Sequence, residues 1–150
     1  MLIGMARSPS LIRDPRDVPV RGTDHHLPPV SPQALTPVQL RERFARPPDW
    51  QPELRGDGGH ALVERAPTGA AVLVPLVPRD GRLSVLLTRR TDRLRDHAGQ
   101  ISFPGGRVDP GEVAPAVTAL REAHEEAGLA ARHVEAIGTL PVYTTVTAYE

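Results

Sequence analysis

One long amphipathic helix, predicted over residues 113–127, most constrains the fold of this 150-residue chain. Its apolar side chains recur with the helical period, at Val113, Ala116, Val117, Leu120, Ala123 and Ala127. Gly128 follows as a C-terminal stop. We expect Gly105 and Gly106, before the helix, to turn the backbone sharply. Because only one long helix separates the predicted strands, the pattern favours a mixed α/β (α+β) sandwich over a parallel doubly wound sheet.

Short apolar stretches on both sides of the helix are typical of strands. The expected strands cover residues 70–77, 83–88, 101–103, 134–140 and 142–149. The first two are predicted to form a hairpin around a turn at Arg79-Asp80-Gly81, and Pro75 indicates an edge position or a bulge. The predicted order of elements is therefore β–β–β–α–β–β.

The N-terminal 60 residues differ from the remainder in composition. Residues 1–60 are expected to be mostly disordered or extended, with a short helix at about 36–45. Thr36 is predicted to cap that helix and Pro37 to be its first residue, where the missing N–H costs nothing. Residues 61–150 are predicted to form the folded domain.

Composition excludes several classes of protein. The 18 basic and 18 acidic residues balance, so bulk electrostatics predicts neither a nucleic-acid partner nor an acidic-membrane partner. The chain has no cysteine, which excludes disulfides, thiolate metal sites and cysteine nucleophiles. No apolar run has the length of a membrane span, and the first residues make a poor signal peptide. A cytoplasmic location is the resulting expectation.

Three glutamates, Glu122, Glu125 and Glu126, are spaced so that they project from one face of the predicted helix. Like charges at this spacing repel each other, so an ordinary surface helix gains nothing from them. A hard divalent cation reverses that balance, because Mg²⁺ prefers oxygen ligands and keeps waters for a phosphate substrate. The spacing therefore predicts metal-assisted chemistry on a phosphate. Arg121 is expected to pair with a carboxylate and orient it, and the Gly106 carbonyl is a candidate further ligand.

A family resemblance rests on these residues, namely Gly106, Glu112, Arg121-Glu122, Glu125-Glu126 and Gly128-Leu129. They resemble the signature box of the Nudix hydrolases. Members of that family use Mg²⁺ or Mn²⁺ to cleave nucleoside diphosphates that are linked to another group. Glu112 lies one residue farther from Arg121 than in the usual pattern. We therefore leave Glu112 out of the predicted site. The resemblance implies a Nudix-type α/β/α sandwich with a mixed β-sheet.

Residues 86–106 resemble the segment that precedes this box in coenzyme A pyrophosphatases. The matching residues are Leu86, Leu87, Thr88, Arg90, Leu94, Arg95, His97, Gly99, Gln100, Phe103, Pro104, Gly105 and Gly106. This resemblance implies hydrolysis of the diphosphate bond of coenzyme A or its derivatives, giving 3′,5′-ADP and 4′-phosphopantetheine. The substrate is then a small molecule.

Roles follow for the individual residues. The predicted catalytic residues are Glu122, Glu125, Glu126 and Arg121, with the general base left unassigned; the metal ligands are the same three glutamates and Gly106. The predicted substrate-binding residues are Arg90, Arg95, His97, Gln100, Gly105 and Gly106. Arginine suits phosphate through its planar fork of donors, whereas a solvated loop is the alternative for the arginines before Gly99. Gly105 and Gly106 would let the backbone approach a ligand.

The resemblance also leaves alternatives open. Coenzyme A pyrophosphatases generally continue with further strands and a closing helix, so a C-terminally incomplete, truncated domain is expected here. An unsatisfied sheet edge would favour association into a homodimer. The alternative activities are a Nudix hydrolase for ADP-ribose or an oxidised deoxynucleotide, and an inactive nucleotide-binding domain.

Overall fold

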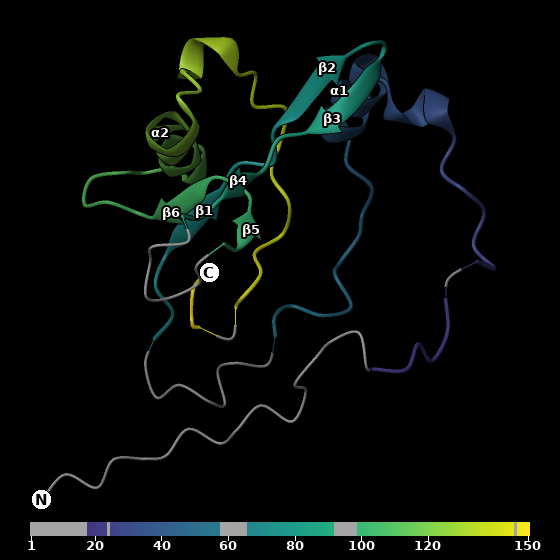
Figure 1. Cartoon of the computed structure of the whole chain (residues 1–150), viewed down its shortest axis with the longest axis horizontal. Coiled ribbons are helices and arrows are strands. Elements are labelled where there is room, and N and C mark those ends of the chain that lie inside the picture. Colours follow the sequence, from purple (N-terminus) through teal and green to yellow (C-terminus); the bar gives the residue numbers. More distant parts are fainter. Residues whose placement is uncertain (1–17, 24, 58–65, 92–98, 146) are drawn as a thin grey trace, which may run out of the picture. The chain divides into compact units, whose positions relative to one another are not determined.

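The computed structural model describes residues 18–23, 25–57, 66–91, 99–145 and 147–150. By its contacts the chain divides into two units, Met1–Val30 and Ser31–Glu150. The described residues of the first unit contain no helix or strand, and the helices and strands that the structure describes lie in the second (Figure 1). The mixed α/β class is confirmed, with strands and helices in one unit. The predicted domain boundary near residue 60 stays a prediction.

The short N-terminal helix forms as predicted. A 3₁₀ turn, η2 (Pro32–Leu35), leads into α1 (Pro37–Ala45). The Thr36 hydroxyl accepts a hydrogen bond from the backbone N–H of Gln39 at 3.4 Å. Helix α1 is held to a later part of the chain by Arg41, whose guanidinium donates to both carboxylate oxygens of Glu135.

The predicted hairpin is present, as β2 (Leu76–Arg79) and β3 (Arg82–Val85) in antiparallel register. Asp80 and Gly81 connect the strands with φ values of 52° and 74°. Such left-handed pairs match the twist of a two-residue hairpin turn. The strand expected over 70–77 is divided, however, because Pro75 has no N–H to continue a ladder. Its first part is β1 (Ala70–Val72).

Two further antiparallel pairs complete the strands of the described residues. β4 (Thr88–Arg89) pairs with β5 (Ile101–Ser102), so the strand expected over 83–88 is divided as well. β6 (Gly105–Arg107) pairs with β1. Gly105 and Gly106 therefore lie in a strand, and the expectation of a sharp turn at them is wrong. Neither has the positive φ that would require glycine; the need for glycine comes from close packing instead.

The long helix, α2 (Pro115–Ala127), packs on β1 and β6 (Figure 1). It begins two residues later than predicted, because Ala114 is extended and Pro115 takes the first helical position. It ends as predicted at Gly128, which has φ 68° and donates its N–H to the His124 carbonyl at 2.9 Å. The buried residues of α2 are Thr118, Ala119 and Ala123. Their small side chains allow helix and strands to approach closely.

The strands predicted at 134–140 and 142–149 are not formed by the described residues. A 3₁₀ turn, η4 (Ala131–His133), follows α2, and beyond it the chain makes only isolated parallel bridges, Thr144 with Gly56 and Tyr149 with Thr68. An apolar extended segment becomes a strand only if a neighbour accepts its backbone hydrogen bonds. None of the described helices is both long and apolar enough for a membrane span.

Candidate functional site

Helix α2 carries all three predicted glutamates, but it gives each a different environment. The Glu122 side chain is 17% exposed and lies against β6, whereas that of Glu125 is 57% exposed. Glu126 also reaches β6, where its Oε2 accepts a hydrogen bond from the Gly105 N–H at 3.3 Å. The helix face predicted from the spacing thus meets one particular strand.

Gly105 and Gly106 make this contact with β6 possible. A Cβ atom built on Gly106 would collide with the Glu122 carboxylate. A Cβ on Gly105 would come within 2.5 Å of the Ala71 carbonyl oxygen and 2.7 Å of the Val72 Cα on the paired strand. Glycine at 106 therefore makes room for a carboxylate, and glycine at 105 makes room for strand pairing.

Arg121 connects the helix to the preceding loop, as a guanidinium fork can with several acceptors at once. Its Nη1 donates to Glu122 Oε1 at 2.9 Å, and its Nη2 donates to the Arg107 carbonyl at 2.9 Å. Its Nε donates to Glu112 Oε1 at 2.9 Å. Nη1 also lies 3.5 Å from Glu125 Oε2. Hydrogen bonds to Glu112 and then Glu122 raise the pKa of Arg121, so it stays charged.

Glu112, which sequence reasoning left out of the site, anchors Arg121. Its side chain is 12% exposed. Its Oε2 accepts from the Asp109 N–H at 2.8 Å and from the Thr118 hydroxyl at 2.7 Å, besides Arg121 Nη2 at 3.3 Å. The Arg121 hydrogen bond first, then those of Thr118 and Asp109, lower the pKa of Glu112 to about 2. Its place just before the helix, within a glutamate–arginine pattern, was the signal that could have identified it.

The donor set suits a hard divalent cation. It consists of carboxylate oxygens on α2 beside the backbone of Gly105 and Gly106, and the chain offers no cysteine to favour a softer metal. Space for a close-lying carboxylate exists only because Gly106 lacks a Cβ. Within the described residues, however, no three acidic or histidine side chains converge as a preformed metal group. The fit therefore rests on the kinds of donor present and on the strand they face.

Two of the predicted phosphate-binding residues are brought together by the β4–β5 pair. The Arg90 N–H donates to the Gln100 carbonyl at 2.9 Å, and both residues are exposed. Arg95 and His97 lie outside the described residues. The pairing therefore places Arg90 and Gln100 side by side, at the two ends of the segment that carries the other candidates.

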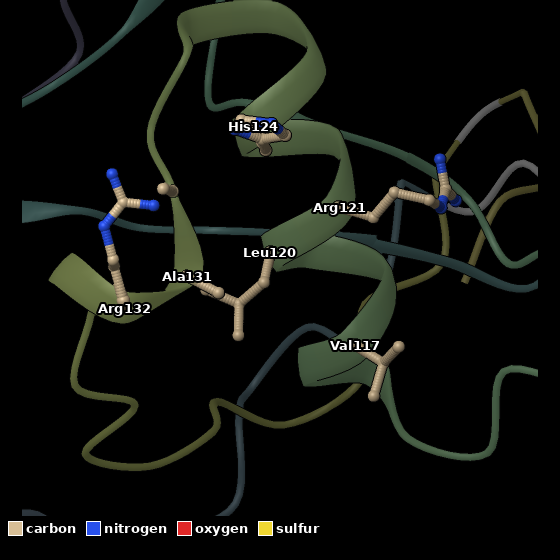
Figure 2. A pocket seen from close by; sticks show the side chains of 7 residues that line it. Val117, Leu120, Arg121, His124, Ala131 and Arg132 are labelled. Atoms are coloured by element: carbon tan, nitrogen blue, oxygen red, sulfur yellow. The ribbon is translucent and has the colours of Figure 1, made fainter.

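A shallow hollow of about 440 Å³ lies on another side of α2, shown in Figure 2. Its lining includes Val117, Leu120 and His124 of α2 and Ala131 and Arg132 of η4. At about 100° per residue, Val117, Leu120 and His124 lie opposite Glu122 and Glu126. His124 lies there and is exposed. Arg121 also lines the hollow, so it lies between the two faces.

Comparison with known proteins finds relatives of this chain among the Nudix hydrolases. A Nudix hydrolase from Citrobacter koseri, called "Uncharacterized Nudix hydrolase NudL", is 49% identical over 81 residues, or 54% of this chain and 42% of the relative. "Nudix hydrolase 3" of Caenorhabditis elegans is 55% identical over 75 residues, or 50% of this chain and 31% of the relative. The chain thus spans less than half the length of either of these curated relatives.

A solved structure, that of the Nudix hydrolase RenU from M. smegmatis, is 36% identical and covers 45% of this chain and 43% of that chain, with a TM-score of 0.39. The sequence profile of the NUDIX domain matches residues 67–150. That range holds β1 to β6, α2 and every residue of the predicted site. The chain belongs to the NUDIX domain family.

Proposed function

We propose that this chain carries the metal-binding face of a divalent-metal-dependent hydrolase that cleaves a small-molecule diphosphate. The observation that carries the proposal is the contact between the glutamates of α2 and the two glycines of β6, stabilised by Arg121. Nudix hydrolases generally use divalent metals, and the chain belongs to that family. The relatives named above are also called Nudix hydrolases, which supports the same reaction class.

The ligands that we assign to Mg²⁺ or Mn²⁺ are Glu122, Glu125, Glu126 and the Gly106 carbonyl. A bound ion would lower the pKa of a coordinated water and offset charge that develops on phosphate oxygens. Arg121 holds the Glu122 carboxylate on the β6 side of the helix through its 2.9 Å hydrogen bond. The Glu125 side chain, which is 57% exposed, has room to rotate toward an ion. We leave the general base unassigned.

The substrate that we propose is coenzyme A or one of its derivatives. Support comes from residues 86–106, whose sequence resembles the coenzyme A pyrophosphatase segment. Arg90 and Gln100, which the β4–β5 pair brings together, are assigned to the substrate phosphates with Arg95 and His97. Water would add across the diphosphate bond, so 3′,5′-ADP and 4′-phosphopantetheine leave as separate products.

A substrate panel tests both the reaction class and the choice of coenzyme A as the substrate. Purified protein is incubated with coenzyme A, ADP-ribose or oxidised dGTP, with Mn²⁺, Mg²⁺ or EDTA, and products are identified by mass spectrometry. We expect 3′,5′-ADP from coenzyme A only when metal is present. Turnover of ADP-ribose or oxidised dGTP alone would overturn the coenzyme A assignment but keep the reaction class. If none of the three is cleaved with either metal, the enzymatic proposal is wrong.

Association into a homodimer is a separate proposal, based on the fact that the strands of the described residues form only two-stranded sheets. Light scattering coupled to size exclusion would give twice the 16.2 kDa mass of the chain if it is right. A single-chain mass at all accessible concentrations would contradict it.

A further inference from the structure

Thr118 is a buried polar residue that the proposed metal chemistry does not use directly. Its side chain is on α2, one turn before Glu122, and the residue is 0% exposed. Its hydroxyl donates to Glu112 Oε2 at 2.7 Å, the shortest of the three hydrogen bonds to that oxygen. A buried hydroxyl needs a partner, and this one takes a loop carboxylate. Thr118 thus ties the first turns of α2 to the loop before it.

The hydroxyl limits how the Glu112 carboxylate can rotate. Thr118 and the Asp109 N–H both occupy Oε2, which leaves Oε1 directed at Arg121 Nε at 2.9 Å. Arg121 in turn uses its Nη1 for Glu122 Oε1, also at 2.9 Å. Because a guanidinium is planar and rigid, a change in one of its hydrogen bonds displaces the others. The position of the Glu122 carboxylate therefore depends on a hydroxyl two residues removed in the network.

We propose that Thr118 is a positioning residue, whose hydroxyl acts through Glu112 and Arg121 to hold Glu122 in place for a divalent cation. The inference rests on the proposed metal-binding function of α2. It differs from an ordinary packing role, because the chemistry of the side chain at position 118, and not only its volume, then sets metal affinity. Loss of the hydroxyl leaves Glu112 with the Asp109 N–H and Arg121 alone, so carboxylate and guanidinium can shift together.

Threonine variants separate the hydroxyl from the shape of the side chain. Thr118→Val keeps the branched shape and removes the hydroxyl, whereas Thr118→Ser keeps the hydroxyl. The dissociation constant for Mn²⁺ is measured by calorimetry on the 150-residue chain. We expect Thr118→Val to raise it roughly tenfold, the low end of the loss typical for an outer partner of a metal ligand. Thr118→Ser should stay close to wild type.

A matched control and a double-mutant cycle complete the design. Thr88→Val removes another part-buried threonine hydroxyl, which donates to the Ser102 carbonyl at 3.3 Å in the β4–β5 pair. This variant should leave Mn²⁺ affinity unchanged. Combining Thr118→Val with Glu112→Gln should weaken Mn²⁺ binding by less than the product of the single effects, because both act through Arg121. If Thr118→Val does not fold, the comparison of Thr118→Ala with Thr118→Ser isolates the same hydroxyl.

A readout without metal keeps this inference distinct from the proposed function. Hydrogen exchange of the Arg121 Nε–H, followed by NMR, should be faster in Thr118→Val than in wild type. Wild-type Mn²⁺ affinity in Thr118→Val, equal loss in Thr118→Val and Thr118→Ser, or strictly multiplicative effects with Glu112→Gln would each overturn the role of Thr118. If wild type binds no Mn²⁺, the proposed function is wrong, and the exchange of Arg121 alone decides whether Thr118 positions it.

Discussion

Replacing either of the two adjacent glycines of β6 by alanine is predicted to damage the protein, but in different ways. Gly105→Ala should lower stability, and Gly106→Ala should lower Mn²⁺ affinity. Both have backbone conformations open to alanine, so neither change introduces backbone strain. At Gly105 the new Cβ would lie 2.5 Å from the Ala71 carbonyl oxygen and 2.7 Å from the Val72 Cα. These are backbone atoms of the paired strand, which cannot move without separating β1 from β6. Such overpacking typically costs about 1–3 kcal/mol in stability.

At Gly106 the obstacle is a side chain instead. The new Cβ would meet the Glu122 carboxylate, which can rotate away and lose its hydrogen bond from Arg121. We therefore expect Gly106→Ala to change stability by less than about 1 kcal/mol, because the reduced entropy of the unfolded chain offsets part of the loss. Its affinity for Mn²⁺ should fall by about 10-fold to 100-fold, because a proposed ligand is displaced.

Urea denaturation and Mn²⁺ calorimetry on both variants test this contrast. Gly105→Ala should lower the urea midpoint while the protein that remains folded still binds Mn²⁺. Gly106→Ala should show the reverse. The reasoning is refuted if both variants lose stability equally, or if Gly106→Ala binds Mn²⁺ as tightly as wild type.

Further predictions concern the carboxylates and their arginine. Glu126→Gln should abolish metal-dependent turnover with an unchanged circular dichroism spectrum; retained turnover would remove Glu126 from the site. The pKa of Glu112 falls from 4.5 to about 2 on folding, so its contribution to stability is complete above pH 4.5 and is lost as the pH falls toward 2. Urea midpoints between pH 3 and 6 should accordingly depend less on pH in Glu112→Gln; an identical dependence would show that Glu112 is unpaired in solution. Arg121→Lys keeps the charge but cannot reach Glu112, Glu122 and the Arg107 carbonyl together, so Mn²⁺ affinity should drop, and wild-type affinity would argue against the fork.

Local rules account for the elements that the sequence predicted correctly. α1 and α2 both begin at a proline. α1 ends just before Pro47, and α2 ends at Gly128 in the left-handed conformation, so their limits depend on neighbouring residues alone. The hairpin around Asp80 and Gly81 likewise depends on a two-residue turn. The predictions were wrong where strand formation depends on a pairing partner elsewhere in the chain. The apolar segments 134–140 and 142–149 have strand-like composition, yet among the described residues they make only isolated bridges.

For the candidate site, the sequence by itself determined that the three carboxylates lie on one face of the helix. Residues spaced three and four positions apart share a helix face in any surroundings. Only the tertiary structure decided what that face meets. It placed β6 against α2, with Gly105 and Gly106 in a strand and not in the expected turn. It also brought the loop residue Glu112 into hydrogen bonds with Arg121 and Thr118. Contacts between a loop, a strand and a helix depend on packing across the chain, and no periodicity along the sequence encodes them.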